Sequence, residues 1–524
     1  MRQQQGSRQH AGAILRQEAQ TGKAFSRWLT VPHVMGLILA VAYILRNSIL
    51  VSVIPGFGST MGSVSYLMLG VCLVYLLAAQ CEINFFAMLL VLACLPGSWD
   101  SAMPDLSLPK YGGWALVVLS IGPTLLGKHA RQLRNGAWTT TMILLSAIGV
   151  GSFFWWVLRL PLMGIGKFTG VMLYANTLGP LAGLGSIFAL SKLIAPAKTN
   201  TKRAWGLVAL ACLISCICAA SRISVIALVL ALTVFAMLER NRIKWSLLML
   251  FVPIVVSGGY LMTSKSESIM ALTATLAEKG LENTREHLWR ARLREFHAHP
   301  LLGVGIGVVE AKELGEGMTI EDGKVSVEPG SSYLGLLSMT GLAGATALVI
   351  LLISVGLKWV RCSRHLADGQ ASQLMVIGAF MAVNAVAEGW IIAVGSPLCF
   401  VFWLWLGHVI DSVDAAELQV AKKVRQRRIA RVSEAGVSEG RRPEFRKDGG
   451  QSFGRTEAGV SEAGVSEAGV SEAGVSEAGV SEAGVSEARV SEAGVAATMT
   501  HARLLSGRNS GLRNSETPIS GGLS

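Results

Sequence analysis

The sequence NTREHLWRARLREFHAHP (residues 283–300), followed by LLGVGIG (301–307), is the centre of the only long polar segment between the first and last apolar runs. Trp289, Leu293 and Phe296 recur at helical spacing, which predicts an amphipathic helix with this face on apolar material. The expected opposite face is charged and carries Arg285, Arg292 and Glu295. A basic amphipathic helix between membrane spans suits an anionic lipid-linked substrate at a membrane surface.

Capping signals bound this helix. Asn283 with Glu286 three places on predicts its start, and Pro300 with the glycine run that follows predicts its end. The GVGIG run is not a dinucleotide fingerprint, because no βαβ unit can form around it. We interpret it as a helix stop and tight turn.

Composition predicts a polytopic membrane protein. The 524 residues are 51% hydrophobic and 15% charged, whereas soluble domains contain about 25% charged residues. The eight cysteines fall in or beside apolar runs and are expected to be small buried hydrophobes, without disulfide or metal roles. The net charge of +12 does not indicate nucleic acid, since Lys and Arg collect in short loops and at both ends.

Apolar runs of about 20 residues predict about 12 transmembrane helices in an all-α fold. The expected spans are 34–54, 64–80, 82–98, 111–127, 138–158, 171–194, 205–220, 222–239, 245–262, 333–357, 371–391 and 394–411. The first span is expected to remain uncleaved.

Loop charges orient these spans. Basic residues fall in every second loop from the fourth onward, including Lys128, Lys198, Arg240 and Lys358, and again after the last span. The positive-inside rule then places both termini in the cytoplasm and the ninth loop, 263–332, outside, which is the periplasm in a Gram-negative cell. We expect a multi-pass inner-membrane protein.

Three regions follow from this pattern. Residues 1–33 form a basic cytoplasmic segment, 34–411 the transmembrane domain, and 412–524 a cytoplasmic low-complexity tail. A Ser-Glu-Ala-Gly-Val unit repeats within 456–495, and such a composition cannot bury a core, so disorder is expected there.

Charged and amide side chains at membrane depth are the candidate functional residues, because placing them there is costly. Arg222, between spans seven and eight, is either a snorkelling loop residue or a phosphate clamp. Arg46 and Glu388 are expected to contact substrate or to pair with another intramembrane polar group. Asn176 fits either a substrate contact or an interhelical hydrogen bond.

The external loop offers candidates for a general base. Its three histidines, His287, His297 and His299, fit either a general base or an ordinary surface residue, and His299 before Pro300 also fits a residue that shapes the turn. Glu328 stands just before the chain re-enters the membrane, unlike the other acidic residues of this loop, which we expect to be solvated.

Four segments together resemble the O-antigen ligase and O-antigen polymerase superfamily of bacterial envelope polysaccharide glycosyltransferases. The resemblance covers about 34–411 and is carried by FTGVMLYANTLG (168–179), Ser221-Arg222, Arg285-x-x-x-Trp289 running into HPLLGVG (299–305), and Ser332-Tyr333-Leu334 leading into GLAG (341–344). AEGW (387–390) and FWL (402–404) are also similar.

The resemblance implies a metal-independent transferase without a cofactor. It would pass a glycan from an undecaprenyl-diphosphate carrier to a hydroxyl of lipid A–core or of another glycan, among membrane lipids. Arg222 and Arg285 would hold the diphosphate, and Trp289, Ser332 and Tyr333 match segments implied to contact substrate. Many relatives have a histidine where this chain has Gly330, so the implied base moves to Glu328 or His299.

Two other functions remain open at this point. A polymerase would use the same donor and differ only in its product. A transporter of a lipid-linked or anionic solute is the alternative from another class, although the chain shows no repeated halves with matched broken helices.

Overall fold

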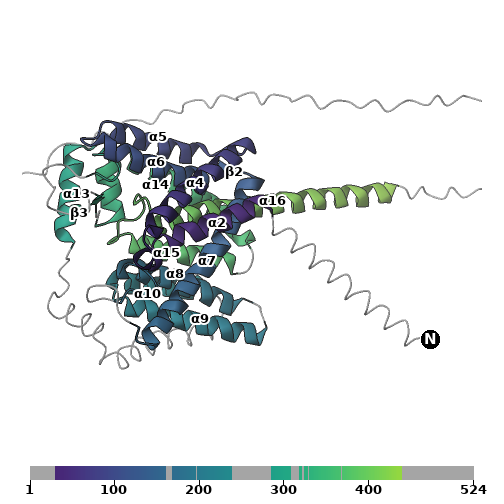
Figure 1. Cartoon of the computed structure of the whole chain (residues 1–524). Coiled ribbons are helices and arrows are strands. Elements are labelled where there is room, and N and C mark those ends of the chain that lie inside the picture. Colours follow the sequence, from purple (N-terminus) through teal and green to yellow (C-terminus); the bar gives the residue numbers. More distant parts are fainter. Residues whose placement is uncertain are drawn as a thin grey trace, which may run out of the picture. The chain divides into compact units, whose positions relative to one another are not determined.

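The computed structural model describes residues 30–160, 168–195, 198–238, 285–308, 318–321, 324–327, 330–366 and 369–439, and in this part the chain is mainly helical (Figure 1). Among these residues, six helices are long and apolar enough to cross a membrane. They are α4 (Phe57–Ala78), α7 (Lys128–Val157), α8 (Ala175–Ile194), α9 (Thr199–Cys218), α14 (Ser332–Cys362) and α16 (Pro397–Glu439).

Shorter helices and two small sheets complete the described fold. The helices are α2 (Val31–Leu45), α3 (Leu50–Val53), α5 (Phe85–Trp99), α6 (Pro104–Ser120), α10 (Arg222–Leu238), α13 (Glu286–Ala298), η2 (Ser363–His365) and α15 (Gln370–Asn384). Each sheet is an antiparallel pair, β1 (Glu82–Ile83) with β2 (Leu125–Leu126) and β3 (Met318–Glu321) with β4 (Lys324–Val327). The external loop was expected to carry short helices, but its described part has one helix and a β-hairpin.

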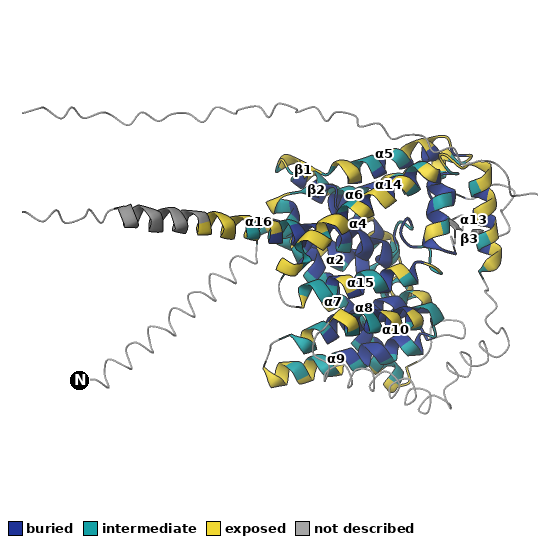
Figure 2. Ribbon diagram, turned by 180° about the vertical axis from the view of Figure 1, so that it is seen from behind, coloured by how far each residue is buried: buried dark blue, intermediate teal, exposed yellow. Residues whose placement is uncertain are grey.

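The outer helices present apolar side chains outward. On α4, Leu69 and Leu76 are fully buried while Val74 is 67% exposed. Figure 2 shows the same division, with exposed residues along the outward faces of α4, α5 and α9. Large apolar side chains on both faces of a helix suit a protein surrounded by hydrocarbon.

Several expected spans have different bounds. The first, 34–54, is interrupted because α2 ends at Leu45, and the eleventh, 371–391, is helical only to Asn384. Helix α16 continues past residue 411 to Glu439, so the start of the expected disordered tail is helical instead. The ninth span, 245–262, and the repeats lie outside the described residues, and the count of 12 stays a prediction.

Small residues let neighbouring helices approach closely. A Cβ on Gly36 of α2 would stand 2.2 Å from the carbonyl oxygen of Leu133 on α7, and one on Gly149 of α7 would stand 2.4 Å from Cys212 Sγ on α9. Such contacts are common where packing, rather than apolar burial from water, holds helices together.

The starts of α8, α10 and α14 meet the end of α15 at one end of the bundle, called here the Arg285 end. Gly179 of α8 lies against Ser221, and the backbone N–H of Ser332 donates to Ala385 O at 2.9 Å. The opposite end, called here the basic end, joins α7 to α16 through a buried pair between Arg134 and Asp411. Figure 1 shows α13 and the exit of α16 on opposite sides of the bundle.

Helix α14 is broken at Gly341, where φ is 61° and ψ is −166°. The segment 300–305, which follows α13, is inserted at this break. Val304 N donates to Ser338 O at 2.9 Å and Gly305 N to Met339 O at 3.1 Å, while Leu342 N donates to Pro300 O at 2.8 Å and Ala343 N to Leu301 O at 3.1 Å. These four bonds stand in for the two intrahelical bonds that an unbroken helix would make between the same groups of α14.

Glycines permit this insertion. Gly303 and Gly305 have φ of 73° and 99°, and a Cβ on Gly303 would lie 2.5 Å from the backbone carbon of Met339. The GVGIG run is therefore a turn after a helix, as expected, and also a buried element between α14 and the α5–α6 region, where Ser101 Oγ donates to Val304 O at 2.8 Å. The insertion fixes the C-terminal end of α13 on the bundle.

Candidate functional site

Arg285 precedes α13 and anchors the N-terminal end of this helix. Its Nη2 donates to Glu388 Oε1 at 2.9 Å, and its Nη1 donates to the carbonyl oxygen of Ala387. Trp289, one turn later, donates from Nε1 to Gly330 O at 3.1 Å. The side chains of Arg285 and Glu388 are 15% and 16% exposed, so the pair is largely shielded from solvent yet reachable.

Glu388 lies in an irregular loop, residues 385–396, that joins α15 to α16. Glu388 was expected near the end of a span, but helix α15 ends at Asn384 and the residues that follow are not helical. Ser332, at the start of α14, organises this loop through one hydroxyl. Its Oγ donates to Glu388 O at 2.6 Å and accepts from Trp390 N at 2.9 Å.

Asn384 is a buried polar residue that sequence reasoning missed. It is 1% exposed, its Nδ2 donates to Ser224 Oγ at 3.2 Å, and its Oδ1 accepts from Trp390 Nε1 at 3.0 Å. Ser224 also shares a hydrogen bond of 2.8 Å with Ser221. The one available signal was an amide within an otherwise apolar run, 374–387, which usually marks an interhelical hydrogen bond.

Arg222 is the first residue of α10 and is partly exposed. Its neighbours Ser221 and Ser224 are buried and connect through Asn384 to the loop that holds Arg285. Two segments that are distant in the sequence therefore belong to one hydrogen-bonded structure at the Arg285 end. Asn176, in the first turn of the adjacent α8, is exposed there.

Arg46 lies beside the other end of the 385–396 loop, at Gly395. Its Nη1 donates to Ser65 Oγ at 3.2 Å, and its guanidinium carbon lies 5.1 Å from the ring centre of Tyr66 and 5.4 Å from that of Tyr43. Tyr43 accepts a hydrogen bond of 3.1 Å from Gly395 N. Arg46 thus has polar and aromatic partners at membrane depth, which was one of the two expected arrangements.

The remaining candidates lie apart from this centre or outside the described residues. Tyr333 is 43% exposed and donates to Ala382 O at 2.8 Å, so it ties α14 to α15. His299 is exposed at the far end of α13 from Arg285, a separation of roughly 20 Å at the helical rise. Glu328 lies outside the described residues.

The expected faces of α13 require a correction. Arg292 and Glu295 were expected to face outward, but both are fully buried and form an ion pair of 2.8 Å, whereas Leu293 is 42% exposed. The helical spacing of the apolar residues had predicted that the charged face of α13 would contact water. A charged pair that neutralises itself inside the fold can replace apolar residues on the packed face.

The fold and the site define a helical membrane protein with a polar, arginine-bearing centre at one end of its bundle. Residues 206–350 match the family model described as O-antigen ligase, which confirms the resemblance found in the sequence. The match runs from α9 to α14 and contains Arg222, Arg285, Trp289, Ser332 and Tyr333, while Arg46, Asn176 and Glu388 lie outside it. No curated protein matches the chain.

Proposed function

We propose that the protein transfers a glycan from an undecaprenyl-diphosphate carrier to an acceptor hydroxyl at the periplasmic face of the inner membrane. The family match supports glycan transfer in a membrane. The arginines at the Arg285 end support an anionic donor, since guanidinium groups pair in a bidentate manner with phosphate oxygens.

One observation carries this proposal. The buried chain of hydrogen bonds from Ser221 through Ser224 and Asn384 to the 385–396 loop joins the element that bears Arg222 to the one that holds Arg285. Two cations at the same end of the bundle would stabilise the negative charge that a leaving diphosphate acquires, and such stabilisation is commonly a large contribution to catalysis.

The proposed step is a direct displacement. The acceptor oxygen forms a bond to the anomeric carbon while the bond from that carbon to the diphosphate oxygen breaks. The electron pair stays on the diphosphate, beside Arg222 and Arg285, and the acceptor proton passes to a carboxylate. Inversion at the anomeric carbon follows from a single displacement.

Glu388 is the carboxylate that we assign as the base. In the unloaded protein it holds Arg285 at 2.9 Å. Donor binding would draw Arg285 toward the diphosphate and free the Glu388 carboxylate for the acceptor proton. Glu328 is a second candidate, and His299 a weaker one because of its distance along α13.

The orientation of the bundle is part of the proposal. The ends of α7, α14 and η2 that face away from Arg285 carry basic residues, which are Lys128, Arg361 and Arg364. By the positive-inside rule, this basic end would face the cytoplasm. The Arg285 end then faces the periplasm, and both termini are cytoplasmic.

Purified protein with a lipid-linked glycan and lipid A–core tests the function. We expect Arg222→Ala and Arg285→Ala each to lower transfer by about 100-fold or more. Arg290→Ala is the matched control, because Arg290 lies on the same helix in an exposed pair with Glu286 and should keep near-normal transfer. Normal turnover in both arginine variants would refute the clamp. Elongated lipid-linked glycan in place of capped lipid A would identify a polymerase.

A further inference from the structure

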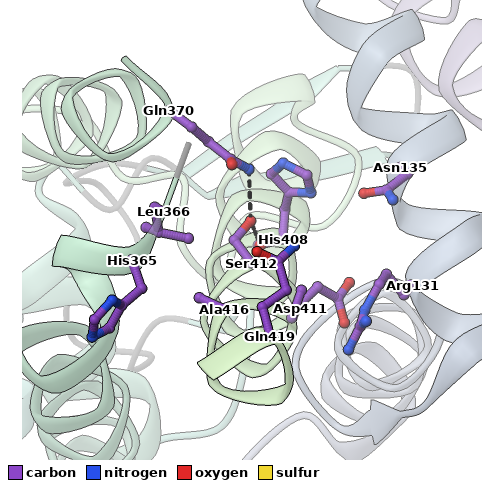
Figure 3. Close-up of a pocket in the computed structure, with 11 residues that line it drawn as sticks. Arg131, Asn135, His365, Leu366, Gln370, His408, Asp411, Ser412, Ala416 and Gln419 are labelled. Carbon is purple, nitrogen blue, oxygen red and sulfur yellow. Dashed lines mark hydrogen bonds between the residues drawn. The ribbon is translucent and has the colours of Figure 1, made fainter. Parts of the chain in front are cut away.

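A polar pocket of about 240 Å³ lies at the basic end, far along the bundle from Arg285. It is lined by residues of α7, α15, α16 and the η2 turn and is partly open (Figure 3). Figure 3 shows Arg131, Asn135, Gln370, His408 and Ser412 around it. The proposed transfer reaction uses none of these residues.

The acidic wall of the pocket is already neutralised. Asp411 accepts from Nε and Nη2 of Arg134, each at 2.6 Å, so both carboxylate oxygens are engaged. Nη1 of Arg134 donates to the carbonyl oxygens of Gly122 and Leu125 at 2.9 and 2.8 Å. Asp411 and Arg134 therefore cancel each other and leave Arg131 as the cation on the pocket lining.

Two buried nitrogen atoms of the lining have no hydrogen-bond partner among the described residues. They are Nε of Arg131 and Nδ1 of His408. The His408 ring stacks on the ring of Trp138, with 5.0 Å between the two ring centres. Leaving a buried polar group unpaired is unfavourable, so a ligand that accepts hydrogen bonds would be favoured here. The Gln370 amide and Ser412 hydroxyl already bond to each other at 3.1 Å and stabilise the opposite wall.

We propose that this pocket binds one phosphate-type oxyanion, held by Arg131 with His408 and the Asn135 amide as further donors. Positive charge and excess donors select an anion, and a guanidinium fits phosphate oxygens. The volume is below the roughly 300–1,000 Å³ of sites for drug-sized ligands, so it suits a single phosphate group. Exposed Arg361 and Arg364 nearby would raise the local concentration of anions. Free phosphate and a phospholipid headgroup both present this chemistry.

Binding is measured on the full-length purified protein. Inorganic phosphate is titrated in detergent, at constant ionic strength against chloride, by the shift in Tm. Phospholipid binding is measured by native mass spectrometry of protein released from nanodiscs that contain phosphatidylglycerol or only phosphatidylcholine. Saturable stabilisation by phosphate identifies the free ion, and one retained phosphatidylglycerol without a phosphate response identifies the lipid.

Substitutions in the pocket test whether the phosphate or phospholipid binds there. We expect Arg131→Gln to weaken binding by about tenfold or more, the loss typical of a charged hydrogen-bonding partner. Lys128→Gln removes the same charge from an exposed position of the same helix and should bind as the unmodified protein does. Asn135→Leu removes a donor and narrows the pocket without changing charge, and it should also weaken binding by about tenfold or more, which decides the question if Arg131→Gln does not fold. Equal losses in Arg131→Gln and Lys128→Gln, or no saturable binding of either probe, would overturn the proposal.

Discussion

Arg285 and Glu388 lie 103 residues apart in the sequence, yet the Nη2 of one is 2.9 Å from Oε1 of the other. This contact joins the start of helix α13 to the loop between the last two described helices. It also brings together the two groups of the proposed reaction. They are the Arg285 guanidinium, which can pair with the diphosphate of the glycan donor, and the Glu388 carboxylate, which can take the proton of the acceptor hydroxyl.

Glu388→Gln is expected to lower transfer by about 100-fold or more, because general-base catalysis typically contributes 10²–10⁴-fold. The glutamine oxygen still accepts from Arg285, so a residue that only positions Arg285 would keep most activity after this change. His299→Gln is the companion variant and should keep near-normal transfer, since His299 lies at the other end of α13. Steady-state transfer rates at saturating donor measure both. The assignment of Glu388 is wrong if the two variants behave alike.

Asn384→Leu is expected to lower both stability and transfer. Leucine leaves the indole N–H of Trp390 unpaired and removes one of the two hydrogen-bond partners of the Ser224 hydroxyl, and a buried donor without a partner costs about 1–3 kcal/mol. Tm in detergent and the transfer rate are measured together. Val386→Ala, at an exposed position two residues further on, is the control and should change neither. Unchanged Tm in Asn384→Leu would mean that the network contributes no stability.

Gly341→Ala and Gly356→Ala test the break in α14 as a matched pair on one helix. A Cβ at Gly341 would lie 2.4 Å from the carbonyl group of Leu301, and its φ of 61° is unfavourable for alanine. We expect a large loss of Tm and of folded yield. Nothing lies within 4 Å of a Cβ at Gly356, so alanine there should be neutral or stabilise by up to about 1 kcal/mol. Equal Tm values for the two variants would contradict the insertion.

Arg134→Ala is expected to destabilise the protein by about 3–5 kcal/mol, because it leaves the Asp411 carboxylate buried without its partner. Lys358→Ala removes one partner of the exposed pair with Asp414 at 3.4 Å and should cost about 0–1 kcal/mol. Chemical unfolding in mixed micelles compares the two. A smaller loss in Arg134→Ala than in Lys358→Ala would show that the buried pair is not a stabilising contact.

Sequence patterns predicted the helical membrane class and the bounds of α13 closely, because hydropathy and capping signals are local. They placed Arg285 and Glu388 among the candidates but not in contact, since nothing local indicates which of several charged residues will pair. The faces of α13 were assigned incorrectly because periodicity cannot anticipate that Arg292 and Glu295 neutralise each other inside the fold. Asn384 was missed for the same reason: its role depends on Ser224, on another helix.

The break in α14 has a consequence for biogenesis. The peptide groups of Leu342 and Ala343 find their acceptors only in residues 300 and 301, which precede α14 in the chain. Before that segment docks, the same two groups can pair only if the helix closes across Gly341, with Ser338 O and Met339 O as acceptors. The broken form of α14 therefore depends on residues 300–305, which precede the helix in the chain. Damage to that segment would alter the shape of α14 as well as the segment itself.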